Sequence, residues 1–275
     1  MQPLDQFAAE KLLQLESQNL RRILVETHRS TNGTAKRSGR ELISFACNDY
    51  LNLSGDSRVV RAAQKAIEQY GVGAGASRLV TGNHPLYQNL EKRLARLKNT
   101  EDACVFGSGY LANLGIIPSL VGVKDLIVAD ELSHACILAA SKLSSAHVEV
   151  FRHNDIHHAA EILNERRAQH PHAMILTDGV FSMDGDLAPL NELSALAKDY
   201  ESWLMTDDAH GVGVLGAGRG STFSSGVQAE VPLQMGTLSK AIGSYGGYLC
   251  ASKSVINLIR TRARTLIYST GLVRF

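Results

Sequence analysis

Cysteine is scarce in this sequence, and no two cysteines lie close together. The 275 residues contain Cys47, Cys104, Cys136 and Cys250, none of them in C-x-x-C spacing. This distribution argues against a zinc site and against a disulfide framework. Each cysteine stands beside apolar residues, which favours buried structural thiols, and we expect no metal site.

The sequence also lacks an excess of charge and a long apolar run. Its 28 basic and 27 acidic residues leave a net charge of +1, which gives no electrostatic basis for binding nucleic acid or an anionic membrane. No apolar run approaches the roughly 20 residues that span a bilayer. The first 22 residues are amphipathic and carry acidic side chains, unlike a signal peptide. We expect a cytoplasmic protein with neither a nucleic-acid nor a membrane partner.

What the chain does contain is an alternation of strand-like and helix-like segments. An amphipathic helix is expected over 5–28 and a strand over 41–47. Further helices are expected at 57–70, 85–99, 109–120, 155–170 and 190–200. Short apolar runs predict strands at 102–107, 126–130, 147–151, 173–178, 202–207 and 231–237. This order predicts an α/β fold with a mainly parallel sheet and helices on both faces.

Polar residues cluster where the predicted strands end. "SGY" follows the first of these strands, "DELSH" the second, "DGVFSMDGD" the fourth and "DDAH" the fifth. Ligands of parallel sheets gather at the carboxyl ends of the strands. The sequence therefore predicts a functional site at this edge of the sheet.

One glycine motif suggests a different site. "GVGVLG" at 211–216 fits G-x-G-x-x-G, and Glu230 lies near the position expected of a ribose-binding acid. A dinucleotide fingerprint requires these glycines to open a helix, whereas "AGRGSTFSSG" follows with no helical periodicity. The context argues against a nucleotide-dependent oxidoreductase, which a test of NAD binding would exclude.

The segment "GTLSKAIGSYGG" at 236–247 places Lys240 among small residues and hydroxyls. A lysine becomes a nucleophile where its surroundings lower its pKa and orient it, although a lysine in such a segment, taken alone, is more often a surface residue in a flexible turn. The additional presence of an acid at a strand end, a "GSGY" helix start and a histidine after another strand favours a pyridoxal-phosphate site.

Several long motifs carry a family resemblance that extends from about residue 20 to residue 270. They are "NDYLNLS", "GVGAGASRLVTG", "DELSHA", "HND", "DGVFSMDGDLAPL", "DDAHGVGVLG" and "TLSKAIGSYGG". With these motifs the chain resembles the α-oxoamine synthases, fold-type-I pyridoxal-phosphate enzymes that join an amino acid to an acyl-CoA with release of CO2. "DELSHA", "FRHND" and "TLIYST" are most similar to the branch that condenses L-alanine with a pimeloyl thioester in biotin biosynthesis. Glycine C-acetyltransferases and 5-aminolevulinate synthases share much of the pattern, so the amino acid, the acyl chain and the thioester carrier stay open.

The resemblance implies catalytic roles for four residues. Lys240 would form the internal aldimine with pyridoxal phosphate and later move protons at the substrate Cα. Asp207 would pair with the protonated pyridine nitrogen, whereas Asp208 is expected to stabilise the loop. His210 would hydrogen-bond the phenolic oxygen of the cofactor, and His134 would stack on its ring and face the substrate.

Further residues would bind the cofactor or the substrates. The backbone N–H groups of Gly109 and Tyr110 and the hydroxyls of Thr237 and Ser239 would hold the phosphate. The remaining candidates are Ser182 near the phenolic oxygen, Asn48 at the amino-acid carboxylate and Arg21 at the acyl substrate. A surface position for Arg21 is an equally good reading.

The resemblance also sets expectations for domains and assembly. Residues 1–40 would form an N-terminal helix and arm, and residues 41–275 the large cofactor-binding domain. Family members carry a further small C-terminal domain with a carboxylate-clamping arginine, which we expect to be absent here. They are homodimers, so a homodimer is expected. The alternative to an acyltransferase is a cofactor-binding chain without turnover.

Two departures from the family pattern stand out. Asn52 occupies a position where glycine is usual, and Tyr87 a position that is often histidine. Asn52 could stiffen its turn at modest cost.

Overall fold

The computed structural model describes residues 2–31 and 33–273, which divide into two units. Residues 1–47 make up the first unit and residues 48–275 the second. The first unit contains helix α1 (Pro3–Ser17) and a three-stranded antiparallel sheet. Its strands are β1 (Thr27–Arg29), β2 (Thr34–Arg37) and β3 (Arg40–Ile43).

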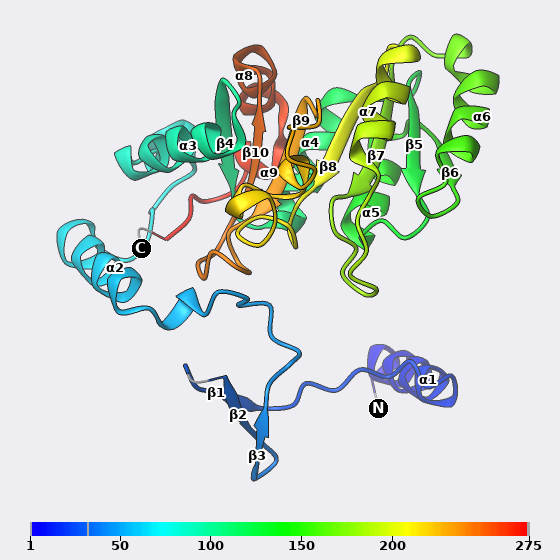
Figure 1. The fold of residues 1–275 in the computed structure, drawn as a ribbon. Coiled ribbons are helices and arrows are strands. Elements are labelled where there is room, and N and C mark those ends of the chain that lie inside the picture. The colour runs from blue at the N-terminus through cyan, green and yellow to red at the C-terminus, as the bar shows by residue number, and fades with distance from the viewer. Residues whose placement is uncertain (1, 32, 274–275) are drawn as a thin grey trace. The chain divides into compact units, whose positions relative to one another are not determined.

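A seven-stranded sheet forms the centre of the second unit, in the order β4-β10-β9-β8-β7-β5-β6 (Figure 1). Its strands are β4 (Asp102–Phe106), β5 (Leu126–Asp130), β6 (His147–Phe151), β7 (Ala173–Asp178), β8 (Trp203–Asp207), β9 (Leu233–Thr237) and β10 (Gly247–Ala251). The run from β9 to β6 is parallel, and β10 is antiparallel to both of its neighbours. The predicted fold class, a mainly parallel sheet, is confirmed.

The helices of the second unit are connected by loops and short turns. They are α2 (Ser57–Tyr70), α3 (Pro85–Lys98), α4 (Gly109–Leu120), α5 (Ala135–Ser144), α6 (Ile156–Arg166), α7 (Leu190–Asp199), α8 (Lys253–Arg262) and α9 (Arg264–Ile267). The short helical turns are Leu53–Gly55, Arg78–Gly82, Arg167–Gln169, Gly216–Gly218 and Ser221–Phe223.

Side chains of each buried strand alternate between two hydrophobic clusters, because successive residues of a strand point to opposite faces. In β5, Ile127 packs in the cluster that contains α4, α5 and α8. Its neighbour Val128 packs in the cluster that contains α6 and α7. Helix α3 packs on the β4 and β10 residues that face away from α4. Helices therefore cover both faces, which is why the strands read as continuous apolar runs.

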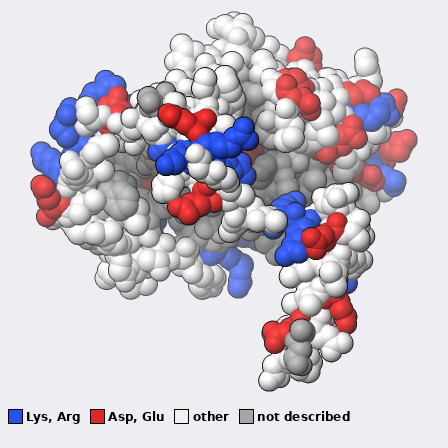
Figure 2. Space-filling view, turned by 90° about the horizontal axis from the view of Figure 1, so that it is seen from below, with Lys and Arg blue, Asp and Glu red and all other residues white. Residues whose placement is uncertain are grey.

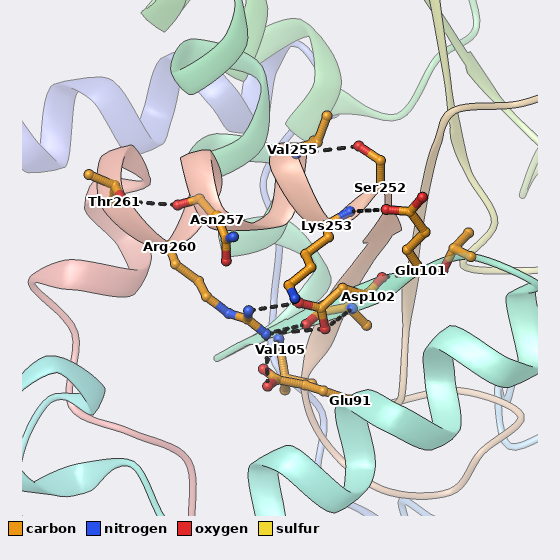
Figure 3. Close-up of polar contacts among 12 residues, drawn as sticks. Glu91, Glu101, Asp102, Val105, Ser252, Lys253, Val255, Asn257, Arg260 and Thr261 are labelled. Carbon is orange, nitrogen blue, oxygen red and sulfur yellow. Dashed lines mark hydrogen bonds and ion pairs between the residues drawn. The ribbon is translucent and has the colours of Figure 1, made fainter.

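Charged side chains cover the free edge of β4, as Figure 3 shows. Arg260 of α8 donates to Asp102 and to the Ala103 carbonyl, the latter at 2.8 Å. Buried Glu91 of α3 accepts the Val105 N–H at 3.0 Å and also contacts Arg260 at 3.3 Å. An unpaired strand edge is open to pairing with other chains. Here ion pairs between helices from both faces occupy those backbone groups.

Several element boundaries differ from the sequence prediction. The first helix ends at Ser17 rather than residue 28, and Asn19 adopts a left-handed backbone with φ 56°. The strand expected over 41–47 is Arg40–Ile43. Asn52 also has a positive φ, 52°, which explains why asparagine can stand where relatives have glycine.

Four helices or strands of the second unit are absent from the sequence prediction: α5, β10, α8 and α9. The antiparallel strand β10 begins at Gly247, directly after the glycine-rich segment that contains Lys240, and this segment hides the start of the strand in the sequence pattern.

Basic and acidic side chains are interspersed on the face shown in Figure 2. In the part of the chain that the structure describes, no helix is both long and apolar enough to cross a membrane.

Candidate active site

A cavity of about 160 Å³ lies at the carboxyl ends of the strands in the second unit. It is lined by Ser108, Gly109, Tyr110, His134, Cys136, Asp178, Asp207, Ala209, His210, Met235, Thr237, Ser239 and Lys240. These residues follow or end β4, β5, β7, β8 and β9. The topology therefore brings together the polar clusters that the sequence placed after its strands.

Lys240 and His210 form a direct contact in this cavity. Lys240 Nζ lies 2.8 Å from His210 Nε2. Burial lowers the pKa of Lys240, and the Asp207 and Asp178 carboxylates oppose that shift. Burial, with the positive charges of Lys240 and His134, lowers the pKa of His210 to about 4. His210 is therefore a neutral imidazole at neutral pH, held against an amine that is easier to deprotonate than an ordinary lysine.

Asp207 ends β8 as a buried carboxylate with 5% exposure. Asn113 of α4 donates to Oδ2 at 2.8 Å, and the Ala209 N–H donates to Oδ1 at 3.0 Å. Among the described residues, no lysine, arginine or histidine lies within ion-pair distance of it. Burial raises its pKa, and the two hydrogen bonds oppose the shift. This carboxylate is thus oriented but lacks a cationic partner.

Asp178 provides a second acid beside Asp207. The two residues are register partners on the parallel strands β7 and β8. Asp178 Oδ1 accepts the His134 N–H at 3.1 Å. Burial and the neighbouring Asp207 raise the pKa of Asp178 to about 8. Two adjacent buried acids favour the arrival of positive charge in the cavity.

The start of α4 forms the opposite side of the cavity. Ser108 caps the helix by accepting the Leu111 N–H at 3.1 Å, which leaves Gly109 and Tyr110 in its first turn. A Cβ on Gly109 would lie 3.4 Å from Thr237 Cβ, and one on Gly247 would lie 2.7 Å from Gly109 Cα. The absence of a side chain on Gly247 therefore lets the start of β10 approach the start of α4 closely. A helix N-terminus with nearby hydroxyls is a favourable site for an anion.

The hydroxyls on that side belong to Thr237 and Ser239. Their oxygens lie 2.7 Å apart, and Thr237 Oγ1 also donates to the Gly246 carbonyl at 2.8 Å. Thr237 is buried at the end of β9, whereas Ser239 is exposed. Both hydroxyls thus stand beside the α4 N-terminus.

Asp208 points away from the cavity into a separate buried ion pair. Lys98 Nζ lies 2.6 Å from its Oδ2, and both side chains are fully buried. The loop at 211–220 wraps around this carboxylate: a Cβ on Gly211 would lie 2.1 Å from Oδ1, and one on Gly220 1.7 Å from Oδ2. The G-x-G-x-x-G match therefore reflects backbone packed around an aspartate.

Three predicted residues are not among those lining the cavity. Ser182 lies in an exposed turn after β7. Arg21 belongs to the first unit, where it pairs with Glu16 at 2.9 Å. Asn48 is connected indirectly, because Tyr50 donates to its Oδ1 at 3.1 Å and lies 2.7 Å from His210 Nδ1. All other predicted site residues line the cavity.

Sequence reasoning missed four residues of this site. Asp178 was visible only as part of a polar cluster, and Tyr50 only as a letter in "NDYLNLS". Cys136 was assigned as a structural thiol, yet it lies 2.7 Å from His134 Nδ1. Buried Asn113 donates to Cys136 at 3.0 Å as well as to Asp207. A buried asparagine inside an apolar helix was a signal that could have been used.

The fold and the residues that line the cavity indicate a fold-type-I pyridoxal-phosphate enzyme, and comparison with known proteins agrees. The model for aminotransferase class I and II matches residues 40–275. The chain belongs to this family, and the predicted resemblance to its α-oxoamine synthase branch is confirmed.

Comparison with individual relatives shows which members of the family the chain is similar to. The chain is 60% identical over 272 residues to an 8-amino-7-oxononanoate synthase of Beijerinckia indica subsp. indica, covering 99% of this chain and 70% of the relative. A serine palmitoyltransferase from S. paucimobilis with bound PLP–myriocin aldimine superposes with a TM-score of 0.87 at 29% identity, covering 100% of this chain and 70% of that one. An 8-amino-7-oxononanoate synthase from Francisella tularensis has a TM-score of 0.70 at 29% identity, covering 83% and 64%.

Proposed function

We propose that this chain is a pyridoxal-phosphate-dependent acyltransferase that condenses L-alanine with a pimeloyl thioester and releases CO2, giving 8-amino-7-oxononanoate for biotin biosynthesis. The observation that carries the proposal is the cavity in which an amine, an unpaired buried carboxylate and a helix N-terminus face one space. The 60% identity to an 8-amino-7-oxononanoate synthase supports the choice of reaction.

The cavity fits pyridoxal phosphate chemically. Lys240 offers an amine for the aldehyde, and Asp207 offers a carboxylate for a protonated ring nitrogen. The α4 N-terminus at Gly109 and Tyr110, with the Thr237 and Ser239 hydroxyls, offers donors for a phosphate. Gly109 adds no side chain on this side of the cavity, where a Cβ would lie 3.3 Å from Met235 Cε and 3.4 Å from Thr237 Cβ. When bound, the cofactor supplies an electron sink for the carbanion formed at the amino-acid Cα.

The residues of the chain then have separate roles. Lys240 takes and returns the proton at the substrate Cα, because its lowered pKa makes the free amine accessible. Asp207 stays ionised once a positive partner is present and keeps that partner protonated. Asn113 orients the carboxylate through a 2.8 Å hydrogen bond. His210 holds the Lys240 amine at 2.8 Å. His134, at the start of α5, faces the same space.

Substrate contacts, domains and location form part of the proposal. We propose that Asn48 and His134 contact the amino acid, that Arg21 contacts the acyl chain, and that Ser182 turns toward the cofactor. Residues 41–275 would be the cofactor-binding domain and 1–40 an N-terminal helix and arm. A cytoplasmic location and a homodimer are also proposed. Helix α2 supports the homodimer, because it exposes Val59 (37%) and Val60 (39%), apolar side chains that a second copy could cover.

A direct experiment tests the function. The purified chain is incubated with pyridoxal phosphate, L-alanine and pimeloyl-CoA, and the product is identified by mass spectrometry. Glycine with acetyl-CoA is run in parallel, because a glycine C-acetyltransferase is the second candidate within the family. The expected result is 8-amino-7-oxononanoate from the alanine reaction, with no product from Lys240→Ala.

The cofactor attachment is tested separately. The expected result is a visible absorption band, and borohydride should fix the cofactor to the peptide that contains Lys240. Attachment to Lys253 or Lys142 would contradict the assignment. A band at Lys240 without turnover in either reaction would identify a cofactor-binding chain instead of an acyltransferase.

A further inference from the structure

A short turn of the chain lies over the candidate site and ends in a hydrogen bond to His210. The turn covers residues 48–55 in the second unit. Asp49 Oδ1 accepts the Leu53 N–H at 3.0 Å, its other oxygen contacts the Ser54 hydroxyl, and its carbonyl accepts the Asn52 N–H at 2.9 Å. These contacts of Asp49 hold the turn together.

This turn packs directly on the two loops that carry His210 and Lys240. A Cβ on Gly243, which has φ 69°, would lie 2.5 Å from Ser54 N and 2.6 Å from the Leu53 carbonyl carbon. A Cβ on Gly213 would lie 3.3 Å from Leu51 Cδ1. Only glycine allows such an approach at Gly243, so the sequences of the loops permit the turn to settle against them.

The side chain that reaches inward from the turn is Tyr50. Its Oη lies 2.7 Å from His210 Nδ1 and donates to Asn48 Oδ1 at 3.1 Å. The other nitrogen of the ring, His210 Nε2, lies 2.8 Å from Lys240 Nζ. The contacts form a continuous line from Lys240 through His210 and Tyr50 to Asn48.

The direction of the hydrogen bonds along this line follows from the donors available. A phenol has one proton, and in this geometry it is given to Asn48. The phenol oxygen is then an acceptor toward His210, so Nδ1 must carry the imidazole proton. Nε2 is left with its lone pair facing the protons of Lys240. With Lys240 protonated, the opposite direction would place an Nε2–H against the protons of the ammonium group.

We propose that Tyr50 is a positioning residue that fixes His210 as the neutral tautomer protonated at Nδ1, with Nε2 accepting a hydrogen bond from Lys240. The lowered pKa of His210 agrees, because a tautomer is defined only for a neutral ring. The groups facing the ring are Tyr50, Lys240 and His134, with Asp207 and Asp178 in the same cavity. The consequence for proton transfer by Lys240 rests on the proposed function.

The tautomer is read from the 15N shifts of the full chain labelled in its imidazole nitrogens, with His210→Gln used to identify the signals of His210. In the parent, we expect His210 to be protonated at Nδ1 alone. In Tyr50→Phe, which removes one oxygen and keeps the ring, we expect the two nitrogen shifts to converge as both tautomers become populated. Tyr245→Phe, at a tyrosine that is 59% exposed, should match the parent. Protonation at Nε2 in the parent would overturn the inference, and so would identical tautomers in the parent and Tyr50→Phe.

A second measurement separates this inference from the proposed function. With pyridoxal phosphate added, exchange of the α-hydrogen of L-alanine in D2O should be about fivefold slower in Tyr50→Phe than in the parent, the effect of losing one net hydrogen bond. Unchanged exchange would overturn the positioning role. No visible band and no exchange in a parent that has the Nδ1 tautomer would overturn the proposed function and leave the tautomer assignment in place.

Discussion

Asp207 and Asp208 are consecutive buried acids at one strand end, yet the protein surrounds them in opposite ways. Asp208 has a lysine 2.6 Å away and a loop of glycines around it. Asp207 has two neutral donors and an open cavity in front of it. Because side chains alternate at a strand end, neighbouring residues point into these different surroundings.

The difference distinguishes a structural acid from one that is available for chemistry. A buried charge that already has its partner is satisfied within the fold, and removal of that partner is strongly destabilising. A buried carboxylate held only by N–H donors remains able to pair with a cation that arrives later. The two acids should therefore respond to substitution in opposite ways, in stability for Asp208 and in chemistry for Asp207.

Removing Lys98 should have the largest effect. Lys98→Met leaves the Asp208 carboxylate buried without a cation, and the expected loss is about 3–5 kcal/mol in the free energy of unfolding. Urea denaturation followed by circular dichroism measures it. The double variant Lys98→Met with Asp208→Leu should regain part of the loss because no charge remains buried. A single variant as stable as the parent would show that Asp208 does not depend on this lysine.

The glycine wrapped around Asp208 gives the second test. Gly220→Ala places a Cβ 1.7 Å from Asp208 Oδ2 and 2.6 Å from Lys98 Nζ, at a φ of 106°. We expect a loss of about 3 kcal/mol in unfolding free energy, from overpacking and backbone strain together.

The matched control for this glycine is Gly226→Ala. Gly226 also has a positive φ, 84°, but a Cβ there meets no atom within 4 Å. The control should lose only the backbone term of about 1 kcal/mol. Equal losses would mean that the approach to Asp208 costs nothing and that only the backbone conformation matters.

Asp207→Asn should have the opposite outcome, a loss of activity without a loss of stability. The proposed function pairs Asp207 with the cofactor ring, so a neutral side chain at this position should lower turnover about 100-fold, as when one electrostatic contact at a reacting group is removed. Asn113 can adapt to the change, because its Oδ1 has no hydrogen-bond partner among the described residues and a rotated amide would accept from the new one.

The pH dependence of stability explains why Asp207→Asn should not be destabilised. The pKa of Asp207 is raised in the folded state, so its ionisation destabilises the cofactor-free protein as pH rises above the unfolded value of 3.8. Asp207→Asn should therefore be at least as stable as the parent at pH 8 in thermal denaturation. A destabilised variant would place Asp207 in the same structural role as Asp208.

Asp207 and Asp208 also show how much of the fold and of the site could be predicted from the sequence. The pattern of apolar runs predicted the parallel sheet, and the family motifs predicted Lys240, Asp207 and His210 at one edge of it. Nothing in the local sequence indicated that Lys98, 110 positions away, would reach Asp208. The same applies to Asn113 and Tyr50, because their contacts depend on how distant elements pack. A periodic pattern reports which face of an element is buried and leaves the partner across that face undetermined.

Asp130 is a third buried acid at a strand end. It extends the comparison because its cationic partner is a histidine, which can lose its charge as pH rises. His153 Nδ1 lies 3.0 Å from Asp130 Oδ1, and Nε2 lies 2.6 Å from Asp186 Oδ2. Asn154 donates to Asp186 at 2.9 Å, and Glu131 accepts the His153 N–H at 2.8 Å. A neutral imidazole has one N–H and could donate to only one of the two carboxylates, so the doubly bonded ring is the charged form.

The smallest expected effect is the pH dependence of this contact. Burial opposes the charge on His153, but the hydrogen bonds and charges of Asp130 and Asp186 outweigh it and raise the pKa. A raised pKa contributes stability that is complete below the unfolded value near 6.5 and is lost as pH rises through the folded value. The difference in unfolding free energy between the parent and His153→Gln should therefore shrink from pH 6 to pH 9. Taking the difference removes the contributions of Asp178 and Asp207, which titrate in both proteins. His157→Gln, at an exposed helix position, controls for the loss of one imidazole elsewhere on the surface. A pH-independent difference for His153→Gln would mean that Asp130 needs no charged partner, and Asp208 would then be the only one of the three acids whose burial depends on a cation.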